Sequence, residues 1–147
     1  QENNSLKLLI AGSGEDEMEI RNFIKLHNLQ KNITLLGYIH NIYPYFKNSK
    51  GFILTSLWED PGFVLIEASY CRVAILSSNV WPGPVELIKD NFNGLLFDID
   101  DNKNFQKKFE QFKTSKNKDK WIFNGLVLAK KFTTFNHYRT LDKLLGF

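Results

Sequence analysis

Cysteine and long apolar runs are what the sequence has least of. Its 147 residues include a single cysteine, Cys71, so an internal disulfide is excluded and a reducing compartment is favoured. We interpret Cys71 as a small core residue of a helix. No apolar run approaches the length that crosses a bilayer, and no signal-peptide pattern is present. These features predict a cytoplasmic protein.

Dense basic runs, internal repeats and low-complexity tracts are also absent. The formal net charge is only +3, which argues against a nucleic-acid-binding protein. An apolar content of 43% over this length is enough for one domain with a hydrophobic core.

Five short apolar runs, each bounded by turn residues, predict β-strands. They cover residues 6–11, 33–36, 51–57, 73–76 and 95–97. Helices are expected at about residues 15–27, from 61 onward, and beginning at 85–89, and residues 42–48 predict a short helix or a turn. This alternation predicts an α/β fold, with one Rossmann-like parallel sheet, right-handed crossovers and helices on both faces. The strand residues expected to be buried are Leu8, Ile10, Ile33, Leu35, Ile53, Val73, Ile75 and Leu96.

Beyond residue 100 the apolar spacing becomes helical. Three stripes predict three helices, marked by Phe105, Phe109 and Phe112, then Trp121, Leu128 and Phe132, then Tyr138, Leu141, Leu144 and Leu145. Residues 113–120 form a charged segment between the first two, which we expect to be solvated.

The first predicted strand ends in Gly12-Ser13-Gly14, which suggests a dinucleotide-binding loop. The position of the third glycine holds Glu17, and the surrounding carboxylates would repel a pyrophosphate. We therefore interpret the acidic residues as favourable partners of a helix dipole.

Residues 51–73 combine a buried strand with a helix. Pro61 suits the first helical turn, and Asp60 is the expected N-cap. Glu67 is unusual because the residues three and four positions away on the helix are apolar or aromatic. A carboxylate on such a face is costly unless something hydrogen-bonds to it.

A second carboxylate, Glu59, stands at the strand exit. The first free N–H groups of the predicted helix, at Gly62, Phe63 and Val64, lie between Glu59 and Glu67 in the sequence. This arrangement suits a polyhydroxylated ligand with an anionic part, because carboxylates accept from hydroxyls and helix N-termini favour anions. Glutamates eight residues apart also occur by chance, so an ordinary strand–helix junction remains the alternative.

The pattern Glu59-x7-Glu67, with Pro61-Gly62-Phe63-Val64 inside and Ala68 after it, resembles the signature of retaining GT-B glycosyltransferases. The similarity is strongest to family 4, the glycosyl transferases group 1, and covers about residues 6–98. It implies two Rossmann-like domains facing a cleft, with this chain similar to the C-terminal domain that binds the nucleotide-sugar donor.

The resemblance also implies roles for particular residues. Glu67 would hold the ribose hydroxyls. Glu59, as the catalytic-site carboxylate, would hold the donor sugar and nearby phosphate together with the N–H groups of Gly62, Phe63 and Val64. Tyr38 and Ile39, which follow a strand end, would border the base, although ordinary loop packing explains them equally well. No metal and no cofactor is implied.

Two further features of the resemblance are less specific. Gly83 and Glu86 match a glycine and a glutamate of a later family helix, but Glu86 could equally be a dipole partner. Trp81 stands where the family has a small residue, so it would either shape the donor pocket or be exposed. His40 has no visible partner, and we interpret it as a solvated loop residue.

One expected element is missing. Family members open the donor domain with a strand and loop whose arginine and lysine clamp the diphosphate, yet only residues 1–5 precede the first predicted strand. Neither Arg21 nor Arg72 fits that position. The resemblance therefore implies a fragment, residues 1–147, that lacks this segment and the N-terminal acceptor domain and is inactive alone.

The parent enzyme would transfer a sugar from a nucleotide sugar to a glycan, lipid-linked or protein acceptor with retention of configuration. It would act in the cytoplasm, with peripheral association at the inner face of the membrane left open. Three alternatives remain: a nucleotide-sugar epimerase or hydrolase of the same fold, a non-catalytic partner subunit, and a flavodoxin-like binding module. The missing third glycine argues against the last.

Overall fold

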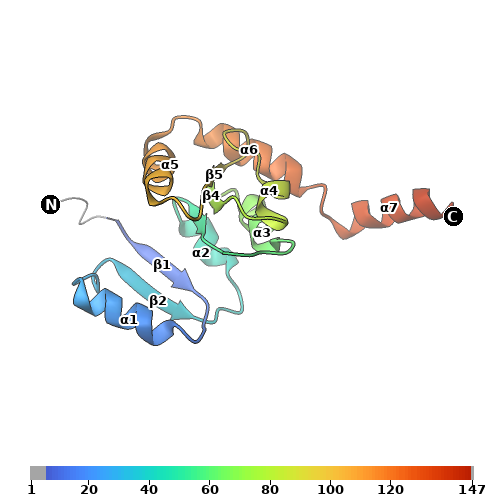
Figure 1. Cartoon of the computed structure of the whole chain (residues 1–147). Helices are drawn as coiled ribbons and strands as arrows, with labels where there is room; N and C mark the ends of the chain where they lie inside the picture. Colours follow the sequence, from blue (N-terminus) through green and yellow to red (C-terminus); the bar gives the residue numbers. More distant parts are fainter. Residues whose placement is uncertain (1–5, 147) are drawn as a thin grey trace. The chain divides into compact units, whose positions relative to one another are not determined.

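The computed structural model describes residues 6–146 (Figure 1). The chain divides into two compact units, with the boundary between Ile42 and Tyr43. Each unit is described separately below.

The first unit is a strand–helix–strand motif. Strand β1 (Leu8–Ala11) pairs in parallel with β2 (Ile33–Gly37), and helix α1 (Glu17–Leu26) connects them. The register shifts by one residue after Ile10, where Gly37 pairs with Ala11. Gly12 and Gly37 both have positive φ, which explains the glycines that end these strands.

The first unit buries little apolar surface. Ile24 of α1 is its one buried apolar residue within the described part of the chain. Leu8 is 44% exposed, so its expected burial was wrong, and Ile10 and Leu35 are only partly buried. The physical reason is size, because two strands and one helix can cover only part of their own apolar surface.

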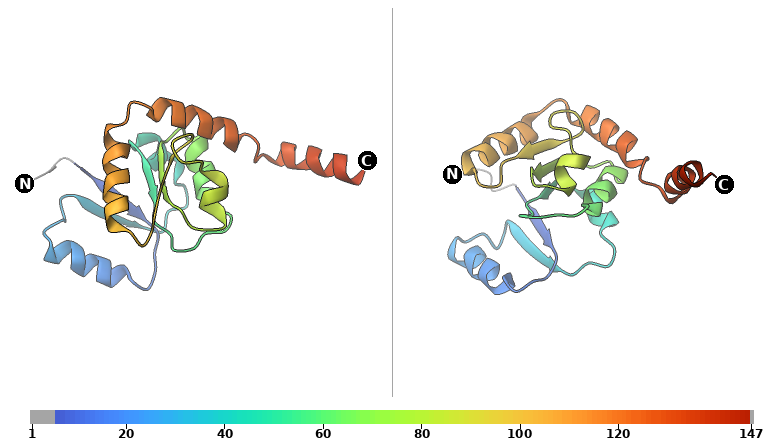
Figure 2. Two further views of the ribbon diagram at one scale, coloured as in Figure 1. Left: turned by 45° about the horizontal axis from the view of Figure 1, so that its top comes forward. Right: turned by 45° about the vertical axis from the view of Figure 1, so that its right-hand side comes forward.

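The second unit contains a three-stranded parallel sheet in the order β3-β4-β5. The strands are β3 (Phe52–Leu54), β4 (Ile75–Ser78) and β5 (Leu95–Phe97). Its helices are α2 (Tyr43–Asn48), α3 (Phe63–Tyr70), α4 (Gly83–Leu87), α5 (Asn102–Thr114), α6 (Lys118–Ala129) and α7 (Thr134–Leu145). Figure 2 shows the sheet between α5 on one side and α3 with α4 on the other, as expected for helices on both faces.

The core of the second unit lies between the sheet and helices α5 and α6. Its buried members are Ala74, Leu76, Leu95, Phe97, Phe112 and Trp121. Trp121 is 1% exposed, and its indole N–H donates to the Asn91 carbonyl at 3.0 Å. The stripe of Phe105, Phe109 and Phe112 faces this core on α5, which confirms the predicted helix.

All strand pairings are parallel, as predicted, but the strands form two sheets within residues 6–146 rather than one. Apolar patterning identifies strands without naming their neighbours, because pairing is set by tertiary contacts. Strand β4 was also misplaced: it covers residues 75–78 rather than 73–76, so Val73 is buried but precedes the strand. Ser77 and Ser78 are buried because their hydroxyls donate to backbone carbonyls.

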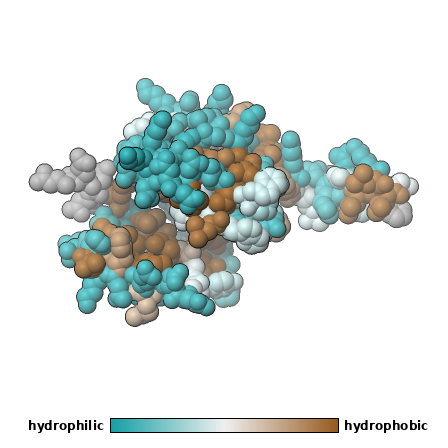
Figure 3. All heavy atoms as spheres, viewed as in Figure 1, coloured by the Kyte–Doolittle hydropathy of each residue, from teal (hydrophilic) through white to brown (hydrophobic). Residues whose placement is uncertain are grey.

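The C-terminal helices contain their predicted stripes except Phe132, which lies after the end of α6. Two further differences are seen. The segment predicted as a charged linker, residues 113–120, is largely helical, and only residues 115–117 separate α5 from α6. Helix α7 has no buried residue and extends away from the β3–β5 sheet (Figures 1 and 2). Figure 3 shows apolar atoms exposed along it.

Candidate functional site

The junction between β3 and α3 differs from its prediction at the helix start. Helix α3 begins at Phe63, two residues after Pro61, and its N-cap is Gly62 rather than Asp60. Gly62 has φ +81°, a left-handed conformation that a helix cannot include, and the Asp60–Pro61 peptide is cis. A Cβ on Gly62 would come within 3.3 Å of Glu59 Cγ and Leu65 Cδ1. Glycine at position 62 therefore brings the helix start close to Glu59.

The N-terminus of α3 presents donors without a side-chain cap in the described part of the chain. The Gly62 carbonyl accepts from the Leu65 N–H at 2.9 Å, which closes the first turn. The N–H groups of Phe63 and Val64 lie within that turn, before the first N–H that bonds back to a residue of the helix start, and Phe63 itself is exposed. These two donors and the helix dipole favour an anionic group. The predicted N–H groups thus stand at the helix start, with Gly62 as the residue before it.

Glu59 is partly buried and held by two interactions. The Ser56 hydroxyl donates to its Oε2 atom at 3.0 Å, and the Gly83 N–H donates to its backbone carbonyl at 3.0 Å. The Ser78 hydroxyl of β4 donates in turn to the Ser56 carbonyl at 2.8 Å. Sequence analysis missed Ser56, because its hydrogen bond to Glu59 depends on the geometry of the loop that joins β3 to α3.

The loop at Gly83 packs directly against the loop at Glu59. A Cβ on Gly83 would lie 2.8 Å from both the Glu59 and the Pro61 carbonyl oxygens. Trp81, two residues earlier, is 68% exposed, as one of its two predicted placements requires. Its role in shaping the donor pocket stays a prediction. Glu86 on α4 is also exposed.

Glu67 lies four residues after the first residue of α3, about 6 Å along the helix axis. It is partly buried, and the Tyr43 hydroxyl of α2 donates to its Oε1 atom at 3.5 Å, the outer limit for such a bond. The charge of Glu67 raises the pKa of Tyr43, with smaller contributions from desolvation and Cys71. Sequence analysis missed Tyr43, since spacing within α3 carries no information about α2.

Cys71 ends α3 and is partly buried, so the predicted core position is only partly correct. Burial raises the pKa of its thiol, Lys47 acts in the opposite direction, and Glu67 raises it further. A thiol in this setting is mostly protonated at neutral pH and is a poor nucleophile.

The two residues predicted to border a base belong to the first unit. Tyr38 follows the end of β2 and is 70% exposed, with its ring edge-on to His40 at 5.0 Å between centroids. Ile39 is partly buried. Because they lie in the other unit, their role beside Glu59 and Glu67 stays a prediction.

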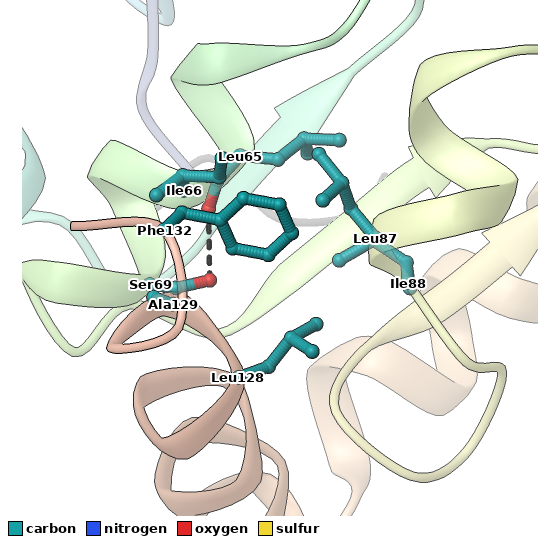
Figure 4. A pocket seen from close by; sticks show the side chains of 8 residues that line it. All are labelled: Leu65, Ile66, Ser69, Leu87, Ile88, Leu128, Ala129 and Phe132. Atoms are coloured by element: carbon teal, nitrogen blue, oxygen red, sulfur yellow. Dashed lines mark hydrogen bonds between the residues drawn. The ribbon is translucent and has the colours of Figure 1, made fainter. Parts of the chain in front are cut away.

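A hollow in the second unit lies elsewhere. It is lined by side chains of α3, α4 with its C-cap, α6 and the turn after α6, as Figure 4 shows: Leu65, Ile66, Ser69, Leu87, Ile88, Leu128, Ala129 and Phe132. Its one polar side chain, Ser69, donates to the Leu65 carbonyl at 2.8 Å. None of the predicted site residues lines it, so it is apolar packing space rather than the predicted site.

Within residues 6–146 no group of three or more histidine, cysteine, aspartate or glutamate side chains could hold a metal ion. The expectation that ligand binding needs no metal stays a prediction. Of the described helices, none is both long enough and apolar enough to cross a membrane.

Two curated relatives from Campylobacter jejuni are similar to this chain, and both are 35% identical to it. One is "GalNAc-alpha-(1->4)-GalNAc-alpha-(1->3)-diNAcBac-PP-undecaprenol alpha-1,4-N-acetyl-D-galactosaminyltransferase", matched over 90% of this chain and 36% of the relative. The other is "N-acetylgalactosamine-N,N'-diacetylbacillosaminyl-diphospho-undecaprenol 4-alpha-N-acetylgalactosaminyltransferase", matched over 78% and 31%. The chain thus spans about a third of their length.

Among solved structures, a mutant of S. aureus TarM in complex with Fondaparinux, alpha-GlcNAc-glycerol and UDP is similar in fold. Its TM-score is 0.84 at 25% identity, and the match covers 98% of this chain and 29% of TarM. The α/β fold of this chain therefore corresponds to one Rossmann-like part of a GT-B enzyme.

The family model for "Glycosyl transferases group 1" matches residues 1–125, which includes both units up to the middle of α6 and the whole Glu59–Glu67 region. The resemblance seen in the sequence is thereby confirmed, and the chain belongs to the glycosyl transferases group 1 family.

Proposed function

We propose that this chain is the nucleotide-sugar-binding domain of a glycosyltransferase that retains anomeric configuration. One observation carries the proposal: the uncapped N-terminus of α3 stands between two partly buried carboxylates, Glu59 before the helix and Glu67 one turn into it. A nucleotide sugar offers hydroxyls for both carboxylates and a diphosphate for the helix N-terminus.

In the proposed complex, Glu67 accepts hydrogen bonds from the ribose hydroxyls. Glu59 accepts from a hydroxyl of the donor sugar, and the N–H groups of Phe63 and Val64 bind a phosphate oxygen. Gly62 supplies the left-handed conformation that lets these groups approach one another. Tyr38 and Ile39 border the base. Each contact mainly positions the donor, and such positioning removes a large share of a reaction barrier.

The donor we propose is a UDP-linked N-acetylhexosamine. Both Campylobacter jejuni relatives are named as N-acetylgalactosaminyltransferases, and the TarM structure contains UDP and a GlcNAc glycoside. The same names support the proposal of retention, because they describe α-linked products and the UDP-N-acetylhexosamine that we propose is itself an α-linked donor. The acceptor hydroxyl therefore has to bond the anomeric carbon on the face that the diphosphate leaves.

The rest of the protein has to supply what this chain lacks. We propose that it provides an acceptor-binding domain and a cationic segment that stabilises the departing diphosphate. Because both relatives are named for undecaprenol-linked acceptors, we propose a lipid-linked glycan as acceptor, reached by a cytoplasmic enzyme at the inner face of the membrane.

The test is product analysis with the complete protein that contains this chain. It is incubated with UDP-GalNAc or UDP-GlcNAc and an undecaprenyl-diphosphate-linked saccharide, and the products are identified by mass spectrometry and NMR. We expect an acceptor extended by one α-linked N-acetylhexosamine. Free sugar, or an epimerised UDP-sugar with an unchanged acceptor, would favour the hydrolase or epimerase alternative. A complete protein that binds no nucleotide sugar would favour the non-catalytic subunit.

A further inference from the structure

The side chain of Glu59 has one hydrogen-bond partner in the described part of the chain. That partner is the Ser56 hydroxyl, which donates to Oε2 at 3.0 Å. Both residues are partly buried, so the contact is less open to competition from water than a surface pair would be. A hydroxyl bonded to one carboxylate oxygen fixes the rotation of the whole group and leaves Oε1 as the atom that can accept from a ligand.

Ser56 is itself held from the sheet. Its carbonyl accepts from the Ser78 hydroxyl at 2.8 Å, and Ser78 is a fully buried residue at the end of β4. Position 56 lies in the loop after β3, so this bond ties that loop to the central strand of the three-stranded sheet. The chain of contacts thus runs from a buried strand through Ser56 to the Glu59 carboxylate.

The backbone of Glu59 is restrained independently. Its carbonyl accepts from the Gly83 N–H, and a Cβ added at Gly62 would lie 3.3 Å from its Cγ atom. These contacts locate the residue but leave the carboxylate free to rotate about its own bonds. The Ser56 hydroxyl is the contact that removes this remaining freedom, and side chains pre-organised in this way bind ligands at a lower entropic cost.

We infer that Ser56 is a positioning residue, which orients the Glu59 carboxylate so that Oε1 accepts a hydroxyl of the donor sugar. The inference rests on the proposed function and adds to it a residue whose effect on ligand binding can be measured separately from that of the proposed nucleotide contacts. Because Ser56 acts through the sugar-binding carboxylate, it should matter for the nucleotide sugar and not for the nucleoside diphosphate alone.

The experiment measures binding of UDP-GalNAc, UDP-GlcNAc and UDP to the complete protein by calorimetry. In Ser56→Ala we expect affinity for the preferred UDP-sugar to fall about tenfold, the loss typical of one hydrogen bond to a charged group, while affinity for UDP changes less than about twofold. Ser56→Thr keeps the hydroxyl and should restore most of the loss. Ser49→Ala is the matched control, since its hydroxyl donates to the Tyr45 carbonyl at 2.7 Å and contacts no predicted site residue.

A double-mutant comparison tests whether Ser56 acts through Glu59. In a Glu59→Gln background, the additional effect of Ser56→Ala on UDP-sugar affinity should shrink to less than about twofold, because the charged acceptor is already lost. Equal losses for UDP and UDP-sugar, or an undiminished loss in the Glu59→Gln background, would overturn the positioning role while leaving the proposed function intact. A wild-type protein that binds UDP but binds neither UDP-GalNAc nor UDP-GlcNAc would overturn both the positioning role and the proposed function. If Ser56→Ala fails to fold, Ser56→Thr and Ser78→Ala give the same comparison, with the threonine variant near wild type and the alanine variant weakened for UDP-sugar alone.

Discussion

The backbone N–H of Gly83 donates to the carbonyl oxygen of Glu59 at 3.0 Å, which joins the loop before α4 to the loop before α3. The two loops are also in close van der Waals contact, because an added Cβ at Gly83 would meet the Glu59 and Pro61 carbonyls at 2.8 Å. The backbone position of Glu59 therefore depends on a glycine 24 residues away in the sequence.

Gly83→Ala should lower the free energy of unfolding by about 1–3 kcal/mol, because the neighbouring atoms are backbone and cannot rotate away. Urea denaturation followed by tryptophan fluorescence measures this loss. Gly125→Ala in α6 is the control in the same unit, since an added methyl group there meets its nearest neighbours at 3.4 Å or more. Equal midpoints for Gly83→Ala and Gly125→Ala would contradict the close packing of the two loops.

Glu67→Gln in the complete protein should weaken binding of a UDP-sugar and of UDP alike, because both ligands carry the ribose that Glu67 is proposed to hold. The expected loss is about 1.5–3 kcal/mol, roughly ten- to a hundred-and-fifty-fold in dissociation constant. Calorimetric titration of each ligand measures it, with Glu110→Gln on α5 as a control for loss of an exposed carboxylate. Unchanged affinity in Glu67→Gln would contradict the ribose-binding role.

The same variant should change the titration of Tyr43. The negative charge of Glu67 raises the pKa of the Tyr43 phenol above its ordinary value of 10.0, so replacing that charge with an amide should lower the pKa. Because the pKa is raised in the folded state, the unfolded chain loses this proton first. Any contribution of this shift to the free energy of unfolding is therefore present below pH 10 and is lost as the pH rises through the pKa of Tyr43 in the folded chain.

NMR of tyrosine-labelled protein between pH 8 and 12 follows the phenol directly, at roughly the pH range where tyrosines ionise. Tyr43→Phe identifies the signal. A Tyr43 titration that is identical in the native protein and in Glu67→Gln would show that Glu67 is not its main electrostatic neighbour.

The isolated chain should bind nucleoside diphosphates weakly and transfer no sugar. The residues that we propose to contact ribose and phosphate are in this sequence, and the cationic pair and acceptor domain that we propose for the complete protein are not. Two missing charge-assisted contacts, at about 1.5–3 kcal/mol each, would place the dissociation constant for UDP at millimolar or above.

Backbone NMR shifts during titration with UDP, GDP and ADP measure this weak binding and locate it. Shifts at Tyr38, Ile39 and residues 62–67 are expected. Shifts centred on residues 12–17 would instead support the dinucleotide-binding interpretation that the sequence argues against. Sugar transfer by the chain alone would show that the upstream segment is dispensable.

The sequence predicted the elements of the fold better than their boundaries or partners. Strand–helix alternation and parallel pairing were correct, because apolar runs bounded by turns depend on local patterning. The start of α3 was wrong, because Asp60 and Pro61 have the composition of a helix start but Gly62 adopts the left-handed conformation. Strand β4 was displaced because serines can be buried when their hydroxyls find backbone acceptors.

In the candidate site, too, the sequence predicted the main residues but not their hydrogen-bond partners. Glu59 and Glu67 could be identified from their positions around a predicted helix start. Their partners Ser56 and Tyr43 could not, because a side-chain hydrogen bond depends on loop geometry and on a helix that precedes the pattern in the sequence. Tyr38 and Ile39 remain predictions, since they belong to the first unit.

The unequal burial of the two units has a consequence for how the chain unfolds locally. Among the described residues, the first unit has a single buried apolar side chain, Ile24, whereas all four residues of β4 in the second unit are buried. Amide hydrogens of β1 and β2 should therefore exchange with deuterium at lower opening free energies than those of β4. The chain then has two unfolding free energies, one for each unit, and a single melting temperature would describe neither.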